Sequence, residues 1–276
     1  MGLGQTLLLG AIAGGTIVFG LPVGRMRNPA PTLRLMLNAI ATGILIFLIW
    51  DVLSHAWEPI DTALGAYHDN HHAGLGSAFG YGALFAAGLI VGLGALVVYE
   101  QWMGRAMKSE LAERTGMASW SVGKHLALMI AVGIGLHNFA EGLAIGQSAA
   151  KNEVALAVLL VVGFGLHNAT EGFGIVAPLA GSHDTDEGRP TWLFLFAMGL
   201  IGGGPTFLGT WIGHGFTSDA VSVIFLTLAA GSILFVVIQL LNVASKAKRS
   251  DLLAVGLLIG ILAGFLTDAI VTAGGA

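Results

Sequence analysis

Eight long apolar stretches, joined by short polar connections, constrain the fold of this chain more than any other feature of its sequence. A helix needs about 20 apolar residues to cross a bilayer, so eight crossings use nearly all of the 276 residues. Only 10% of the residues are charged, against about 25% in a soluble domain. We therefore predict an all-α membrane protein, a single polytopic transmembrane domain over residues 1–276. Its eight predicted spans are Leu3–Val23, Leu35–Ala56, Leu75–Tyr99, Val122–Gln147, Val154–Ala180, Trp192–Gly213, Val221–Val243 and Leu252–Ala273.

The basic residues support this span count. Eleven of the twelve fall in alternate connections, beginning after the first span, and Lys151 alone falls on the other side. The eleven are Arg25, Arg27, Arg34, Arg105, Lys108, Arg114, Lys124, Arg189, Lys246, Lys248 and Arg249. Loops rich in Lys and Arg stay in the cytoplasm, which predicts a multi-pass protein of the cell membrane with both termini outside. Nothing in the chain is basic enough to bind nucleic acid, and the lack of cysteine excludes disulfides and thiolate metal sites.

One phrase occurs twice, in the fourth and fifth predicted spans. Residues 133–146 read GIGLHNFAEGLAIG and residues 163–176 read GFGLHNATEGFGIV, identical at eight of fourteen positions and offset by 30 residues. In each copy a His and a Glu stand four residues apart, so they share one face of a helix. The pairs are His137 with Glu141 and His167 with Glu171.

The two copies are expected to meet inside the membrane. A short turn joins the two spans, which makes them antiparallel neighbours and places the pairs at similar depth. Two facing carboxylates would repel each other in a medium of low dielectric, and a divalent cation bound between them removes that cost. Imidazole and carboxylate are both ligands of divalent transition metals, and Asn138 and Asn168 add amide oxygens. The alternative is a proton-sharing polar cluster that holds two helices together.

The doubled His-Asn-x-x-Glu-Gly motif, together with the eight spans, resembles the ZIP (Zrt/Irt-like) family of divalent metal transporters. The resemblance implies an eight-helix bundle with both termini outside, often dimeric, in which the helices of the site move against a scaffold. It also implies that His137, Glu141, His167 and Glu171 form the main transport site and that Asn138 and Asn168 contribute to a neighbouring one.

The sequence departs from the family pattern at several positions. Ala140 and Thr170 replace the prolines that usually precede each Glu, and Gly204 replaces the Glu before Pro205. Gln239, Leu240 and Asn242 stand where the family has an acidic pair and a proline in the seventh span. These changes favour one well-formed metal position and a weak or absent second.

Other polar residues have two readings each. Asp51 and His55, one turn apart, form either a metal waypoint near the outer mouth or a wet interfacial cluster. Asp268 fits a helix-packing group better than a ligand, and His125 and His214 fit interfacial positions. The connection between the second and third spans is either a collector of cations or a solvated loop; its polar residues are Glu58, Asp61, His68, Asp69, His71 and His72. The acidic connection 181–189 is better interpreted as a polar turn than as an exit for cations.

The leading functional prediction is a permease for a divalent transition metal, zinc first and iron, manganese or cobalt as alternatives. Import towards the cytoplasm follows from the resemblance. The main alternative is an intramembrane hydrolase in which a metal-bound water attacks a lipid-like substrate. A metal-stabilised structural or sensing protein is a third.

Overall fold

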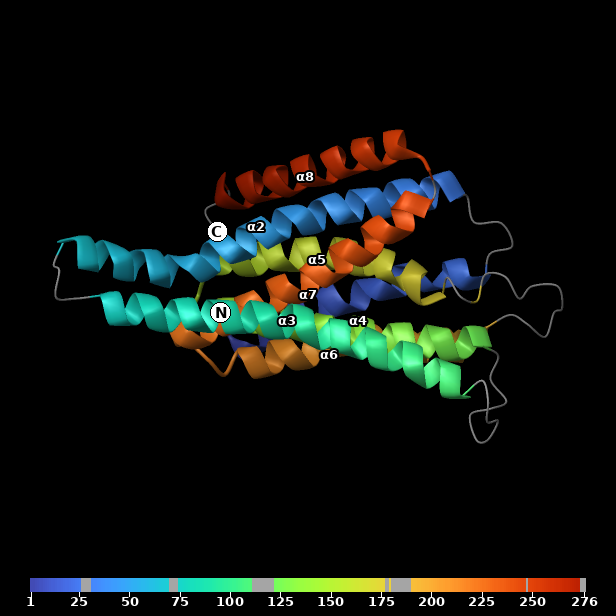
Figure 1. Ribbon diagram of the computed structural model, residues 1–276, viewed down its shortest axis with the longest axis horizontal. Coiled ribbons are helices and arrows are strands. Elements are labelled where there is room, and N and C mark those ends of the chain that lie inside the picture. Colours follow the sequence, from blue (N-terminus) through green and yellow to red (C-terminus); the bar gives the residue numbers. More distant parts are fainter. Residues whose placement is uncertain are drawn as a thin grey trace.

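The computed structural model describes residues 1–25, 31–69, 74–110, 122–176, 179, 190–246 and 248–273, and Figure 1 shows them as one elongated bundle of helices. Within this part of the chain eight helices are long and apolar enough to cross a membrane, which confirms the predicted count. The α-helices are α1 (Leu3–Gly15), α2 (Pro31–Asp69), α3 (Leu75–Glu110), α4 (Val122–Ala150), α5 (Val154–Val176), α6 (Trp192–Gly213), α7 (Asp219–Lys246) and α8 (Ser250–Ala273). Two short 3₁₀ helices, η1 (Thr16–Phe19) and η2 (Leu21–Arg25), extend the first span. The two ends of the chain lie at the same end of the bundle (Figure 1), as an even number of crossings requires.

Two helices are longer than predicted. The predicted second span ended at Ala56, but α2 runs for 39 residues, through Pro59, to Asp69. The predicted third span ended at Tyr99, but α3 runs for 36 residues. The ends of α2 and α3 nearest their connection project past the other helices (Figure 1). Hydropathy marks where a helix leaves the apolar region, not where it ends, and polar residues such as Glu58 and Asp61 continue α2.

Several predicted features fall partly outside the described residues. These are His71 and His72 of the cation-collector connection, the acidic connection 181–189, residues 177, 178 and 180 at the end of the fifth predicted span, and Arg27 and Arg114 among the basic residues.

The helices divide into two groups by their packing. The first group holds α1, α4, α5 and α6 with the 3₁₀ segments, and its most extensive contact joins α4 to α6. The second group holds α2, α3, α7 and α8, where α2 packs on α8 and α3 on α7. The two groups meet mainly where α7 lies against α4 and α2 lies against α5.

Glycine sets the closeness of packing inside each group. In the first group a Cβ added at Gly142 of α4 would overlap the carbonyl oxygen of Thr206 of α6. In the second, a Cβ at Gly260 of α8 would overlap the carbonyl oxygen of Ile40 of α2. Small residues let helix backbones approach closely in lipid. The glycines therefore lock helix backbones together within each group.

The interface between the groups is built differently. The described glycines that face across it, Gly133 and Gly163, meet side chains of Tyr99 and Leu48 and no backbone of the opposite group. An apolar cluster of buried side chains from α2, α4, α5 and α7 fills the interface on the side towards the α4–α5 turn, with Leu48, Leu160, Phe164 and Leu226 among its members. Side-chain contacts of this kind can rearrange when the two groups shift against each other, without separating helix backbones that are in direct contact.

Candidate metal site between α4 and α5

The repeated motif lies on two antiparallel helices joined by a turn of three residues. The turn spans Lys151–Glu153, and Asn152 takes the left-handed backbone conformation, with φ 64°. Asn adopts this conformation more readily than most residues because its short side chain bonds locally. A turn this short keeps α4 and α5 side by side and places the two copies of the motif opposite each other.

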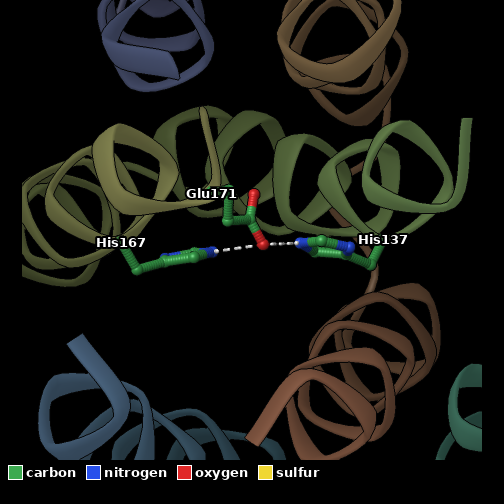
Figure 2. Close-up of side chains that lie close together, drawn as sticks. All are labelled: His137, His167 and Glu171. Atoms are coloured by element: carbon green, nitrogen blue, oxygen red, sulfur yellow. Dashed lines mark ion pairs between the residues drawn. The ribbon is translucent and has the colours of Figure 1, made fainter. Parts of the chain in front are cut away.

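The four His and Glu side chains pair crosswise between the helices. Nε2 of His137 lies 2.8 Å from Oε1 of Glu171, and Nε2 of His167 lies 3.3 Å from Oε1 of Glu141. Figure 2 shows the two imidazoles pointing at the Glu171 carboxylate from opposite sides. Nε2 of His167 also lies 3.7 Å from Oε1 of Glu171 within α5. Each carboxylate is therefore shared with the other copy of the motif.

All four side chains are buried, with at most 6% of any of these residues exposed. Among the described residues, the Nε2 atoms of both histidines and both oxygens of each glutamate lack a hydrogen bond of normal geometry. Unpaired buried polar atoms are costly, and so many in one place call for an ion or water that binds them together. The cluster is polar and shielded, and its own members leave it unsatisfied.

The spacing of these atoms suits one divalent cation. Zinc binds imidazole and carboxylate at about 2.0–2.2 Å, which sets tetrahedral ligand atoms about 3.3–3.6 Å apart. Ligand atoms of His137, His167 and Glu171 all lie within 4.8 Å of one another, and Glu141 adjoins His167. The pair distances of 2.8, 3.3 and 3.7 Å bracket the tetrahedral value. His137, His167 and Glu171 could thus hold one ion together, whereas Glu141 lies 3.3 Å from Nε2 of His167 and outside this group of three.

The two asparagines anchor the site helices to their neighbours. Asn138 donates from Nδ2 to the carbonyl oxygen of Gly202 on α6 at 2.9 Å, and Asn168 donates to the carbonyl oxygen of Ala13 on α1 at 3.0 Å. Both residues are fully buried, and neither Oδ1 has a hydrogen-bond partner in the described part of the chain. The amides are thus held by their nitrogens, and their oxygens stay available to a ligand.

The positions that depart from the family pattern bring no carboxylate to this cluster. A Cβ added at Gly204 would meet only Leu200, one turn earlier on α6, within 4 Å. Gln239 donates to a carboxylate oxygen of Glu100 on α3 at 2.6 Å, away from the site, and Asn242 is exposed. At Ala140 and Thr170, which stand where the family usually has proline, α4 and α5 continue as unbroken helix.

The remaining candidates from the sequence lie apart from this cluster. Asp51 is buried and His55 half-buried, with 3.7 Å between them and a 2.9 Å hydrogen bond from the His55 ring to the Asp51 carbonyl oxygen. His214 caps the end of α6 and His125 lies in the first turn of α4, both near helix ends as expected. Asp268 is half-buried on α8.

A cavity of about 390 Å³ opens beyond the site, at the end of the bundle that carries the α4–α5 turn. It is lined from α2, α3, the turn and α7, with His55, Glu58, Lys151, Glu153 and Asp219 among its polar walls. The apolar cluster at the group interface lies between this cavity and the His/Glu site. The sequence analysis placed His55 and Glu58 near the outer end of the pathway but did not single out Lys151 and Asp219. The signal for Lys151 was that it is the one basic residue in the connections predicted to lie outside.

Comparison with models of protein families gives a match. The family model described as ZIP zinc transporter matches residues 104–272, more than half of the chain and including both copies of the motif. A search of curated proteins finds no match.

Proposed function

The chain belongs to the ZIP zinc transporter family, and from that premise we propose that it carries its cation between α4 and α5, on His137, Glu141, His167 and Glu171. The family transports divalent metal ions, and the eight spans make this chain a multi-pass membrane protein. Membership of a transporter family removes the support for the hydrolase alternative.

The observation that carries the proposal is the crosswise pairing of two buried carboxylates with two buried imidazoles. Two ionised carboxylates with neutral imidazoles carry a charge of about −2, which is expensive at membrane depth. One divalent cation brings the sum to zero. A neutral complex costs less to hold in an apolar interior than either the bare ion or the empty anionic site.

The donor set restricts the cargo. It offers nitrogen and oxygen ligands without thiolate, which suits zinc, iron, manganese and cobalt in their divalent states. Zinc is the first choice because it accepts four such ligands in tetrahedral geometry. The free amide oxygens of Asn138 and Asn168 provide two further weak ligands for an ion that changes its coordination in transit.

The division into two helix groups supports a way to move the ion. All four ligands lie on α4 and α5, in the glycine-locked first group. The second group contacts it across an interface of side chains. Displacement of the first group against the second would carry the whole ligand set from one side of the membrane towards the other.

Orientation and assembly stay predictions. The basic loops favour both termini outside and movement of the cation towards the cytoplasm. A homodimer is implied by the resemblance to the family.

Uptake by sealed proteoliposomes tests the proposal. Purified protein should move Zn²⁺ into vesicles that hold a zinc-sensitive dye, and Glu141→Gln and Glu171→Gln should each abolish the flux. Glu100→Gln, on α3 and outside the cluster, is the matched control and should transport as the parent does. Flux that survives in both site variants would contradict the assignment.

A further inference from the structure

Lys151 is the exception to the charge distribution, and the structure places it at the boundary between the two helix groups. It lies in the α4–α5 turn, which belongs to the first group. Its Nζ lies 2.8 Å from Oε1 of Glu153 in the same turn and 3.0 Å from Oδ1 of Asp219, the first residue of α7 in the second group. One ammonium group therefore joins the part that holds the ligands to the part that does not.

The bridge is charged and partly shielded. The side chain of Lys151 is only 21% exposed. Burial acts to lower the pKa of Lys151, but the hydrogen bonds to Glu153 and Asp219 outweigh it, and the pKa lies above its usual value. The ammonium form is therefore the one present at neutral pH.

A second contact joins the same two elements one turn deeper. Ser222 of α7 donates to Oε1 of Gln147 of α4 at 3.1 Å, and both residues are buried. Below it, every residue of α4 from Glu141 to Ala149 is buried, whereas most of the described residues between Gly123 and Ile134 are only half-buried. The end of α4 next to Lys151 is thus closely covered by its neighbours, with Ser222 of the second group among them, and the opposite end of α4 is covered less.

We propose that Lys151 is a gating residue: its bridge from the α4–α5 turn to Asp219 holds shut the end of the pathway that faces the 390 Å³ cavity. The bridge must open before the first group can move and expose the His/Glu site to that cavity. This inference rests on the proposed function, because it assumes that the two groups move during transport. It adds a residue that controls the movement without binding the cargo.

The lack of native cysteine allows a direct test. The double variant Lys151→Cys with Asp219→Cys carries two thiols, one on each group. A short bifunctional thiol reagent that ties them together should stop Zn²⁺ uptake by proteoliposomes, and reduction of a cleavable reagent should restore it. The control is Lys151→Cys with Glu153→Cys, whose thiols both lie in the turn, and its transport should not respond to the reagent.

Two further measurements complete the test. Zn²⁺ binding at equilibrium in detergent should be unchanged by the Lys151–Asp219 crosslink, since the ligands are untouched. Lys151→Met, which removes the charge, should raise the initial uptake rate about two- to five-fold, the range an exposed ion pair accounts for. Lys151→Arg should leave it unchanged.

Uptake that continues through a complete Lys151–Asp219 crosslink would overturn the proposal, and so would an unchanged or lower rate in Lys151→Met. If the proposed metal site is wrong, Glu141→Gln and Glu171→Gln will bind Zn²⁺ as tightly as the parent protein does. The experiments therefore distinguish failure of the gating proposal from failure of the proposed metal site.

Discussion

Nε2 of His137 on α4 lies 2.8 Å from Oε1 of Glu171 on α5, although each of these residues has a motif partner on its own helix. The reciprocal pair, His167 with Glu141, lies at 3.3 Å. Duplication of the motif therefore does more than double the ligands. Neither helix holds a complete set of contacts, so any force that separates α4 from α5 also opens the cluster.

The two glutamates should differ in their effect on binding. Glu171 lies within 4.0 Å of both imidazoles, whereas Glu141 does so only with His167 among the described ion pairs. Glu171→Gln should weaken Zn²⁺ binding at least about 100-fold, the upper end of what loss of a supporting partner costs. Glu141→Gln should weaken it less, about 10-fold or more. Calorimetric titration of detergent-solubilised protein measures both, and a larger loss in Glu141→Gln would contradict the crosswise geometry.

Metal should also stabilise the fold. A ligand that binds only the folded protein adds about 2.7 kcal/mol at 100 times its dissociation constant. Addition of Zn²⁺ should therefore raise the midpoint of thermal unfolding of the parent, and a chelator should reverse the change. The double variant Glu141→Gln with Glu171→Gln should show no such response. An equal shift in the double variant would place the stabilising metal elsewhere.

Substitution of Asn138 distinguishes a residue that anchors α4 to α6 from one that binds the metal. Asn138→Leu removes both the hydrogen bond to Gly202 and the free amide oxygen, whereas Asn138→Asp keeps the oxygen and loses the donor. A lost buried hydrogen bond costs about 1–3 kcal/mol, so both variants should unfold at lower temperature. Zn²⁺ affinity should fall in Asn138→Leu and be retained in Asn138→Asp. Equal affinity in all three proteins would assign Asn138 to anchoring alone.

Much of the fold could be predicted from the sequence, because the membrane makes hydropathy decisive. An apolar run of about 20 residues has few alternatives to a spanning helix. Each of the eight predicted runs corresponds to a helix long and apolar enough to cross a membrane. The predicted C-terminal end of α2 was wrong because a helix that continues beyond the apolar region leaves no signal in hydropathy. Glu58 and Asp61 are as compatible with solvated helix as with a loop.

The site was predicted less completely. The i, i+4 spacing predicted that His and Glu share one face of each helix and that the two faces meet between α4 and α5. The shortest contacts in the structure join the His of one helix to the Glu of the other, a pairing that the spacing alone did not predict. That outcome depends on the rotation of α4 against α5, which packing with α6 and α1 decides. The role of Lys151 depends likewise on where α7 begins, a contact of high sequence separation that no local pattern reports.

Two glycines of the second motif should respond oppositely to the same change. A Cβ at Gly172 would overlap the carbonyl oxygen of Ile17, whereas a Cβ at Gly174 would meet nothing within 4 Å. Gly172→Ala should lower the free energy of unfolding by about 1–3 kcal/mol or more because the backbones of α5 and η1 must separate. Gly174→Ala should be neutral or slightly stabilising, since Ala suits a helix better than Gly. Thermal unfolding in detergent compares them, and similar destabilisation of both would contradict the close packing of η1 on α5.

Two connections at opposite ends of α7 allow a test of the predicted orientation. Thr217, between α6 and α7, and Ser250, at the start of α8, are both exposed. If the basic loops face the cytoplasm, Thr217 lies outside and Ser250 inside. In a chain without other cysteines, a membrane-impermeant maleimide should label Thr217→Cys in intact cells and should label Ser250→Cys only after permeabilisation. The reverse pattern would place Lys151 and the 390 Å³ cavity on the cytoplasmic face, so the bridge would then close the inner end of the pathway instead of the outer one.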